Sequence, residues 1–182
     1  MPKESYIPRL SALFRQYGYD GATLSKISEA TGLGKASLYH HFPGGKDEMV
    51  ESVLCYSATW LHENVLSHLT AASSPEARLQ KMCDRVNELY AGGTEPCLLA
   101  ILQSGTGQAL RHAQIKATLA AWIEAIAVVL REAGWEDEIA QQRAEDALIT
   151  IQGAVMVSFT LDNPAVFQRV MQSLPQVILK QP

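Results

Sequence analysis

The chain has 182 residues, of which 47% are apolar and 19% are charged, with 15 basic against 19 acidic side chains. This composition excludes an intrinsically disordered chain, and the length is that of one domain or of two small domains. The longest runs without a charged residue, at positions 96–110 and 147–161, have 15 residues each, which is too short for a membrane span.

The N-terminus and the cysteines indicate where the protein works. The first five residues, Met1 to Ser5, lead into a mixture of polar and apolar residues rather than an unbroken apolar segment, so we expect no secretory signal. The three cysteines, Cys55, Cys83 and Cys97, are odd in number and widely spaced, which argues against a disulfide framework and against a zinc pattern. We therefore expect a cytoplasmic protein with at least one free thiol.

Apolar periodicity predicts three short helices in the first 45 residues. The first is expected over about residues 5–17, with Ser5 as its N-cap and Pro8 in its first turn. The second begins after Thr23 and ends at Gly32, and the third starts three residues later and ends before the Pro-Gly-Gly sequence at 43–45. The residues expected to face the core are Ile7, Leu10, Phe14, Tyr17, Leu24, Ile27, Ala30, Leu38 and Phe42.

Longer helices are predicted for the rest of the chain. Helices are expected over residues 46–69 and from a start signal at 73–76 to about residue 90. A short helical segment that ends near residue 103 follows, and then a helix that ends at Gly134. The last two helices are expected over residues 137–161 and from Asn163-Pro164 onward. The apolar stripe expected for the helix 46–69 consists of Met49, Val53, Tyr56 and Trp60. The sequence therefore predicts an all-α fold of about nine helices with no convincing strand.

Charge is distributed unevenly along the chain. Residues 1–50 carry six basic and five acidic side chains, and the remainder carries nine basic and fourteen acidic ones. Between Thr23 and Lys46 there are three lysines and one glutamate. A slightly basic N-terminal part on an acidic body favours an anionic partner for the N-terminal part.

Residues 23–42 fit the requirements of a helix-turn-helix. A turn containing Gly32 would join the second and third predicted helices, and apolar residues would fix the angle between them. The third helix could then insert its N-terminal end into a major groove. The residues expected to lock the two helices together are Ile27, Ala30, Leu33 and Leu38.

The outward residues of this motif suit contacts with DNA. Lys35 can reach guanine O6 and N7, and Ser37 can reach a base or a phosphate. Tyr39 and the two following histidines supply hydroxyl and imidazole donors. The helix N-termini near Thr23 and Lys46 offer backbone N–H groups to phosphate oxygens.

The first ~50 residues resemble the DNA-binding domain of TetR-family transcriptional regulators. The resemblance rests on Phe14, Gly18, Thr23, Ile27, the block Leu38-Tyr39-His40-His41-Phe42, and Lys46. The linker 43–45 is one residue longer than usual, which resembles a subgroup similar to the repressors of lincomycin-resistance operons. Gly34 departs from the family pattern, because the family often has Ser or Thr at this N-cap.

The resemblance implies roles for individual residues. Tyr39, His41 and Lys46 should hold phosphates, while Lys35, Ala36, Ser37 and His40 should face bases. The full set of expected DNA contacts is Thr23, Ser25, Lys35, Ala36, Ser37, Tyr39, His40, His41 and Lys46. We accordingly expect a DNA-binding domain at residues 1–48 and a ligand-binding and dimerisation domain at residues 49–182.

The resemblance also implies a ligand cavity in the helical body. Aromatic residues, Met and one buried amide would suit an apolar pocket with a single orienting group. Any one of these residues is more often part of an ordinary core than a ligand contact. The candidate lining residues are Trp60, Met82, Val86, Tyr90, Trp122, Ile126, Gln152, Met156 and Phe159.

The last two helices are expected to form a dimer interface. Residues 144–157 and 167–179 are too apolar to leave more than one face in water. A two-fold dimer would place two recognition helices roughly 34–36 Å apart on a palindrome. The helix 46–69, with one end beside the recognition helix and the other beside the expected pocket, would transmit the effect of a ligand.

The function expected from these features is a homodimeric repressor that a small apolar or amphipathic ligand releases from DNA. A DNA-binding regulator without ligand sensing is one alternative, and a helical-bundle enzyme is another, although the chain lacks a catalytic constellation. His40 and His41 point about 100° apart on a helix and have no third ligand in view, so we expect no metal site. The Gly-rich stretch 32–36 lacks the pattern of a phosphate-binding loop, and we expect no cofactor.

Overall fold

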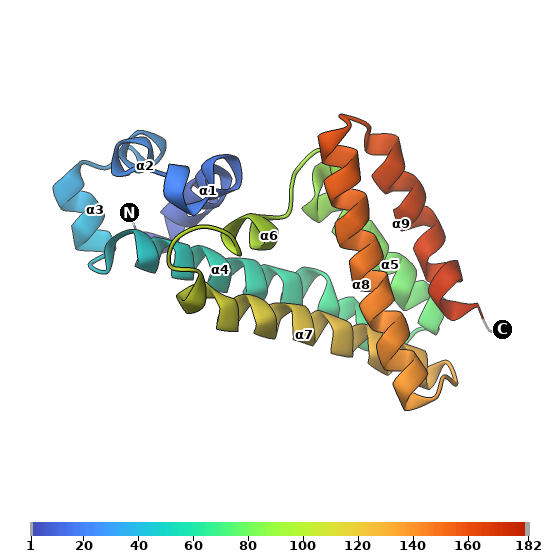
Figure 1. Cartoon of the computed structure of the whole chain (residues 1–182). Coiled ribbons are helices and arrows are strands. Elements are labelled where there is room, and N and C mark those ends of the chain that lie inside the picture. Colours follow the sequence, from blue (N-terminus) through green and yellow to red (C-terminus); the bar gives the residue numbers. More distant parts are fainter. Residues whose placement is uncertain (1, 181–182) are drawn as a thin grey trace. The chain divides into compact units, whose positions relative to one another are not determined.

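The computed structural model describes residues 2–180, with the side chains of Gln108 and Leu110 left out. Within this range it contains nine α-helices and no strand, which confirms the predicted all-α fold (Figure 1). Its contacts define two compact units: unit 1 comprises residues up to Thr59 together with Leu98–Ala117, and unit 2 comprises Trp60–Cys97 with Thr118 to the C-terminus. These units differ from the division expected after residue 48, because α4 (Gly45–Asn64) continues without a break and α6 (Leu98–Leu102) packs against α1 (Ile7–Gly21).

Unit 1 is built around the helices of the predicted helix-turn-helix. A short 3-10 helix, η1 (Lys3–Tyr6), precedes α1, and α2 (Leu24–Thr31) and α3 (Lys35–His41) follow it. The first turns of α7 (Gln108–Glu132) also belong to this unit. The largest side chains of its core that are fully buried include Leu10, Phe14, Ile27, Leu38, Phe42 and Met49.

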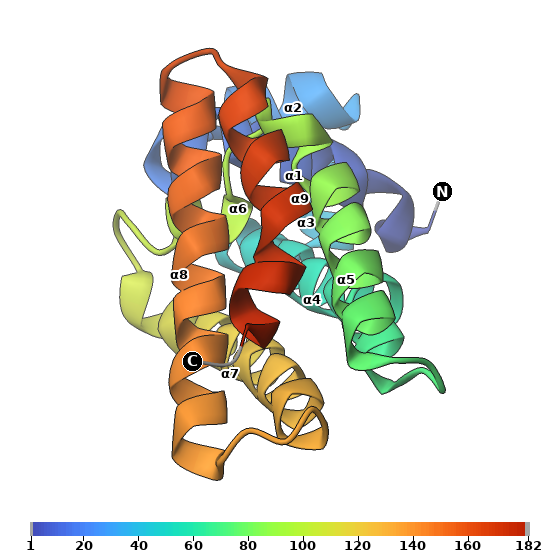
Figure 2. The same cartoon turned by 90° about the vertical axis from the view of Figure 1, so that its right-hand side faces the viewer.

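Unit 2 contains α5 (Pro75–Leu89), α8 (Asp137–Thr160), α9 (Pro164–Leu179) and the larger part of α7. Two 3-10 segments, η2 (Leu66–Thr70) and η3 (Ala91–Gly93), flank α5. Helix α9 packs against both α8 and α5 (Figure 2). The fully buried side chains of this unit include Leu79, Met82, Val86, Ile151 and Phe167.

Side-chain caps set three of the predicted helix starts. The hydroxyl of Thr23 accepts a hydrogen bond from Lys26 N at 3.4 Å, and that of Ser74 accepts one from Ala77 N at 3.2 Å. The side chain of Asn163 accepts from the N–H two residues further on, at 3.2 Å. These caps satisfy first-turn donors that have no partner within their helix, and the predicted starts are confirmed.

The expected start of the first helix was wrong. The Ser5 hydroxyl donates to the Pro2 carbonyl at 2.7 Å, and Tyr6 precedes the first residue of α1. Pro8 still lies in the first turn, where its missing N–H costs nothing. Gly18 interrupts the helix as expected, with φ 65° and ψ −174°, and helical residues resume as far as Gly21.

Some predicted core positions and one helix end also differ from the structure. Tyr17, Leu24 and Tyr56 are between 37% and 46% exposed, so they do not belong to the core. Tyr17 instead lies under the ammonium group of Lys26, 3.7 Å from its ring centre. The helix expected to reach residue 69 ends at Asn64, because a side chain from α5 binds its last carbonyl group.

Residues 111–132 of α7 have the length and composition of a membrane-spanning helix. A third of this stretch is buried in the structure. The buried positions include Trp122, Ile126 and Val129, which recur at helical spacing. A helix that packs one apolar face into a core passes the same length and composition criteria, so this stretch is weak evidence of membrane insertion.

Candidate nucleic-acid interface

Hydrogen bonds from neighbouring helices hold the turn between α2 and α3. Gly32 has φ 72° and ends α2 in the left-handed conformation. Thr31 donates its hydroxyl proton to Ile27 O at 2.7 Å and accepts from Leu33 N at 3.3 Å. Arg9 of α1 donates to the Thr31 carbonyl at 3.3 Å. The turn is therefore fixed to the first helix, and α3 has a defined orientation on this support.

Helix α3 is anchored by one side and exposed on the other. Its buried residue is Leu38, which is 1% exposed, and Phe42 follows it into the core. Gly34 caps the helix without a side chain, as expected. Among the described residues, Lys35 makes no hydrogen bond or ion pair, so its ammonium group is free to bind an external partner. The exposed residues of this helix are Lys35, Ala36, Ser37, Tyr39 and His40.

A shallow groove of about 580 Å³ runs along the outer side of α2 and α3. Ser25, Ser28 and Lys35 line it together with the exposed Leu24. Glu29 also lines the groove and contributes its only acidic side chain. The groove thus brings two of the predicted DNA contacts, Ser25 and Lys35, to one surface, and it explains why Leu24 is not buried.

Two of the other expected phosphate contacts, His41 and Lys46, have protein partners, while Tyr39 is exposed. His41 is half-buried, with its ring 5.2 Å from that of Tyr6. Lys46 donates from Nζ to the Tyr19 carbonyl at 2.9 Å, and its ammonium lies 4.2 Å from the centre of the Tyr19 ring. At the start of α4, the Gly44 N–H donates to Glu48 Oε2 at 2.7 Å, so a carboxylate occupies a donor that was expected to face DNA.

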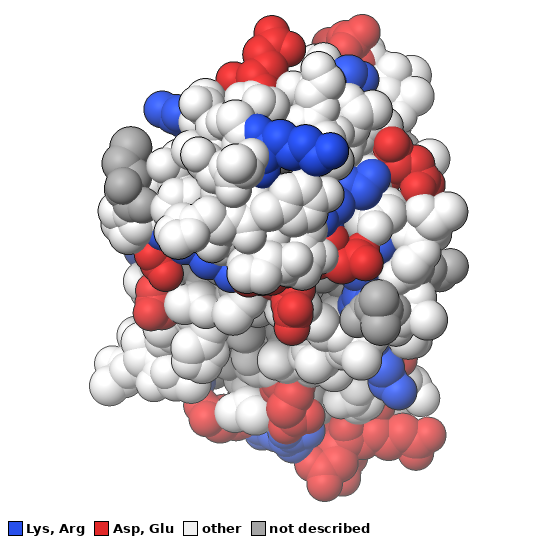
Figure 3. Space-filling model, turned by 90° about the vertical axis from the view of Figure 1, so that its left-hand side faces the viewer, with Lys and Arg blue, Asp and Glu red and all other residues white. Residues whose placement is uncertain are grey.

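The surface around α3 carries little charge. Figure 3 shows the side of the molecule nearest α3, where uncharged residues make up most of the surface, with separate Lys, Arg, Asp and Glu side chains among them. Glu48 is paired with Lys3, with 2.5 Å between Nζ and Oε1, and these bonds keep the pKa of Glu48 below its ordinary value. The surface of α3 thus offers uncharged hydrogen-bond donors next to a few lysine side chains. This combination suits contacts with phosphates and bases.

The expected ligand-lining residues do not all face the interior of unit 2. Five of them are buried, and Gln152 and Trp60 are half-buried. Met156 and Phe159 lie on the outer surface of α8, 69% and 45% exposed, because α8 turns its opposite face toward α9. These two residues therefore do not line an internal pocket of the unit. The five buried residues are Met82, Val86, Tyr90, Trp122 and Ile126.

Polar groups accompany the buried apolar residues of unit 2. The amide of Gln152 donates to the Tyr90 hydroxyl at 3.0 Å, and Tyr90 donates to Cys97 Sγ at 3.6 Å. The Tyr90 ring stands edge-on to that of Phe167, with 5.8 Å between centres. The indole N–H of Trp122 is buried without a hydrogen-bond partner among the described residues. It is the kind of donor that a bound ligand could satisfy.

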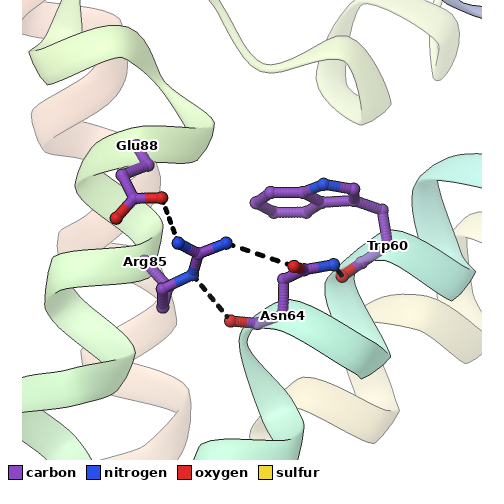
Figure 4. A network of polar contacts seen from close by, with 4 residues as sticks. All are labelled: Trp60, Asn64, Arg85 and Glu88. Atoms are coloured by element: carbon purple, nitrogen blue, oxygen red, sulfur yellow. Dashed lines mark hydrogen bonds and ion pairs between the residues drawn. The ribbon is translucent and has the colours of Figure 1, made fainter.

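Trp60 belongs to a polar network at the end of α4 (Figure 4). Arg85 donates to the Asn64 carbonyl at 3.2 Å and to its side-chain oxygen at 3.1 Å, and it also pairs with Glu88. The Asn64 amide in turn donates to the Trp60 carbonyl at 3.0 Å. The guanidinium lies 5.8 Å from the centre of the Trp60 ring, so this indole contacts a cation of α5 rather than apolar side chains alone.

Sequence reasoning missed a cluster of residues at the back of the helix-turn-helix. Asp20 at the end of α1 contacts the loop that precedes α7, where Thr106 N donates to Asp20 Oδ2 at 3.1 Å. Arg111 is buried and lies 4.3 Å from the centre of the Tyr19 ring. Since 86 residues separate Asp20 from Thr106, no local pattern could have revealed this contact.

The orientation of α3 on a fixed turn defines a helix-turn-helix DNA-binding protein. A model of the TetR family of bacterial regulatory proteins matches residues 11–53, and a model of the C-terminal domain of LmrA/YxaF-like transcriptional regulators matches residues 70–173. The chain therefore belongs to the TetR family and to its LmrA/YxaF-like group. The resemblance predicted from the sequence is confirmed, and the family is one of transcriptional regulators rather than enzymes.

Individual relatives agree with this assignment. The HTH-type transcriptional regulator LmrA of Bacillus subtilis is 23% identical over 181 residues, which cover 97% of this chain and 96% of that protein. The biofilm operon icaADBC HTH-type negative transcriptional regulator IcaR of Staphylococcus aureus is 42% identical over 53 residues, covering 29% of this chain and 28% of IcaR.

Solved structures share the fold. A TetR transcriptional regulator from Legionella pneumophila matches with a TM-score of 0.82 and 22% identity, over 94% of each chain. The TetR-family regulator CifR, as a cysteine mutant complexed with 26-bp operator DNA, matches with a TM-score of 0.77 and 20% identity, over 95% of each chain. At these identities the likeness establishes the fold, with an N-terminal helix-turn-helix and a C-terminal helical domain.

Proposed function

We propose that this protein is a transcriptional repressor that binds a palindromic operator as a homodimer and leaves it when a small apolar or amphipathic ligand binds in unit 2. The observation that carries the proposal is the exposed surface of α3, where Lys35 has no partner among the described residues and small side chains flank it. Small residues allow the backbone to approach base edges. The negative regulation named for IcaR and the operator bound by CifR support this direction of control.

The DNA contacts are proposed in two groups. Lys35, Ala36, Ser37 and His40 would face the bases, since all four are exposed on α3. The remaining contacts would bind phosphates from the edges of the groove and from the starts of the helices. This second group consists of Thr23, Ser25, Tyr39, His41 and Lys46.

The dimer is proposed to form through α8 and α9. Each helix carries an outer stripe of residues at helical spacing that are poorly covered by the rest of the chain. On α8 the stripe is Ile149, Gly153, Met156 and Val157, and on α9 it is Val166, Val170, Ser173 and Val177. A groove of about 390 Å³ lies between the two helices, and Val177 of the α9 stripe lines it together with Thr150 of α8. Packing against a second copy would remove both stripes from water.

The effector is proposed to enter the interior of unit 2. Apart from Arg78, which pairs with Glu132, the buried side chains there are apolar or neutral, which suits an uncharged or amphipathic molecule. Trp122 would donate its indole N–H to an acceptor on the ligand, and the hydroxyl of Tyr90 and amide of Gln152 would orient it. A ligand that favours a different spacing of the two recognition helices would release the operator by lowering the affinity for DNA on the order of 5–150-fold.

Binding to DNA is tested with duplexes selected by the protein from a random pool, so that no operator needs to be known. We expect retention that weakens with salt along a log–log slope of about −0.9 per phosphate contact. Lys35→Ala should weaken binding at least tenfold and relax the preference at one base pair. The matched control is Lys81→Ala, which removes an exposed lysine of α5 in unit 2. Failure of the wild-type chain to select any duplex would refute the proposal.

The effector is tested with a panel of small apolar compounds in the same retention assay. A compound that releases the duplex should also raise the melting temperature of the free protein, because ligands stabilise the state they bind. Val86→Trp, which fills the interior of unit 2, should abolish both effects while leaving DNA retention intact. Release that persists in this variant would place the effector elsewhere.

A further inference from the structure

Tyr19 occupies an unusual position among charged groups of unit 1. Its ring centre lies 4.2 Å from the ammonium of Lys46 and 4.3 Å from the guanidinium carbon of Arg111. Its carbonyl accepts from Lys46 Nζ at 2.9 Å, and its hydroxyl donates to Asp47. Burial and the bond to Asp47 raise the pKa of the hydroxyl to about 12, so it remains a donor at physiological pH. One aromatic ring therefore contacts cations from the start of α4 and the start of α7.

Arg111 connects this ring to the loop before α7. Arg111 is 5% exposed, and its guanidinium donates to the carbonyl of Leu102, the last residue of α6, at 2.8 Å, and to the loop carbonyls of Ser104 at 3.2 Å and Thr106 at 2.7 Å. Breaking these bonds would leave a buried charge without partners, which is costly. The loop and the cation against Tyr19 therefore move together.

The same loop is fastened to the end of α1. Thr106 donates to Asp20 from its N–H at 3.1 Å and from its hydroxyl. Gly105 has φ 90°, and a Cβ there would lie 2.5 Å from Asp20 Oδ2, so only glycine permits this close approach. The loop is thus attached to α1 on one side and to Tyr19, through Arg111, on the other.

We propose that Tyr19 is a positioning residue for DNA binding, because its ring and carbonyl hold Lys46 in place. Since Arg111 at the start of α7 packs against the same ring, the position of Lys46 also depends on the position of the start of α7. This inference rests on the proposed DNA-binding function and on Lys46 as a phosphate contact. The helix corresponding to α4 was expected to transmit a ligand's effect, and α7 also begins in unit 1 and continues into unit 2. A shift of α7 would withdraw Arg111 from Tyr19 and change the position of Lys46.

A neighbouring residue supplies the control for this inference. Tyr17 also lies on α1 and also contacts a lysine, with Lys26 Nζ 3.7 Å from its ring centre. Lys26 belongs to α2, so this second pair does not involve the loop or α7. Tyr17→Leu therefore removes a comparable tyrosine–lysine contact without touching the connection to Arg111.

The test uses the full-length chain and a duplex selected from a random pool by the wild-type protein. Amide hydrogen exchange of residues 103–107 is compared with and without the duplex. In the wild type, DNA should slow exchange in this loop several-fold, because coupling between two sites is reciprocal. Tyr19→Phe keeps the ring and Tyr17→Leu keeps the cluster, so both should respond like the wild type. Tyr19→Leu should abolish the response and weaken DNA binding about five- to tenfold.

The salt dependence of binding separates positioning from a general loss of stability. In Tyr19→Leu the log–log slope should become shallower by about 0.9 for each phosphate that Lys46 no longer binds. Lys46→Gln, at a half-exposed site, should lower the slope equally and abolish the loop response, and it replaces Tyr19→Leu if that variant does not fold. A normal slope in Tyr19→Leu, or a loop response that persists in Lys46→Gln, overturns the inference. If the wild type selects no duplex, the proposed function fails as well.

Discussion

Two lysines of the helix-turn-helix, Lys35 and Lys46, have different surroundings in unit 1. Lys35 follows a helix-capping glycine on an exposed face, and the periodicity of Leu38 and Phe42 is sufficient to place it outward. Lys46 was expected to face DNA in the same way, yet it binds the carbonyl and ring of a tyrosine 27 residues away. Local patterns predict which side of a helix is exposed, but they do not predict which side chains from other helices reach it.

Two glycines at positive φ differ in how closely other atoms surround them, and the difference can be measured as a change in the free energy of unfolding. Gly93 has φ 96°, and a Cβ there would lie 2.6 Å from both Phe167 Cβ and Ser158 Oγ. Gly93→Ala should therefore reduce the free energy of unfolding by about 2–4 kcal/mol, from backbone strain and a clash that shifts its neighbours. Urea denaturation followed by circular dichroism measures the change.

The control for this variant is Gly134→Ala. Gly134 has almost the same φ, 94°, but no atom lies within 4 Å of the added Cβ. This substitution should cost only the backbone term, about 1–2 kcal/mol. If both variants lose the same free energy of unfolding, the clash of the added Cβ with Phe167 and Ser158 contributes nothing to the loss.

Asp20 makes a contribution to stability that depends on pH. The hydroxyl and N–H of Thr106 donate to its carboxylate and lower its pKa below the ordinary 3.8. A carboxyl group whose pKa is lowered on folding stabilises the protein above its unfolded pKa, and this contribution is lost as the pH falls through the folded value. Asp20→Asn should therefore lower the urea midpoint equally at pH 7 and pH 5.

Below pH 3.8 the difference between Asp20→Asn and the wild type should shrink toward zero. Asp146→Asn is the matched control, because Asp146 is exposed on α8 and makes no hydrogen bond among the described residues. Its midpoint should follow that of the wild type throughout the series. A difference for Asp20→Asn that stays constant down to the lowest pH would contradict the role assigned to the carboxylate.

At the scale of helices, starts were easier to predict than ends. Thr23, Ser74 and Asn163 cap the residues directly after them, so the signal is local. The end of α4 depends instead on Arg85, which lies 21 residues beyond Asn64. The predicted continuation to residue 69 followed a helical pattern that this contact overrides, and the chain forms the 3-10 helix η2 there.

Arg85 should therefore be needed to end α4 where it ends. Its guanidinium places a positive charge at the C-terminal end of the helix and satisfies a carbonyl that has no partner within it. Arg85→Leu should lower the free energy of unfolding by about 1–3 kcal/mol, since the hydrogen bonds that it removes involve a charged donor. Chemical denaturation measures this loss.

Glu88→Gln separates the helix cap from the ion pair in the same network (Figure 4). Glu88 is exposed and pairs with Arg85 without contacting Asn64. Exposed ion pairs contribute about 0–1 kcal/mol, so this variant should be nearly as stable as the wild type. If both variants lose the same stability, the ion pair and not the cap accounts for the effect.

At the scale of the whole molecule, the sequence predicted the all-α class and the family of regulators, but not the composition of the compact units. Residues 98–117 pack with the helix-turn-helix although they lie far beyond it in the chain. Likewise, Met156 and Phe159 have the size and polarity of pocket residues, and only the packing of α8 against α9 places them outside. Apolar composition defines what must be buried, while the partner that buries it follows from the fold.

That exposed stripe leads to a prediction about assembly. Ile149 is 68% exposed in the single chain and belongs to the α8 stripe of the proposed interface. Ile149→Glu would place a charge where a second copy should pack, and burying an unpaired charge is strongly unfavourable. We expect the wild type to sediment at twice the mass of one chain and this variant at the mass of one chain, with unchanged helical content by circular dichroism.

Loss of the dimer should also affect DNA binding, because the two half-sites of a palindrome are then no longer bound by one linked particle. Operator affinity of Ile149→Glu should fall at least 100-fold, although every residue of α3 is intact. Ala77→Glu is the matched control: it adds the same charge to an exposed position in the first turn of α5, where a helix N-terminus tolerates it. This control should remain dimeric and bind normally, whereas a dimeric Ile149→Glu variant would exclude the α8–α9 stripe as the interface.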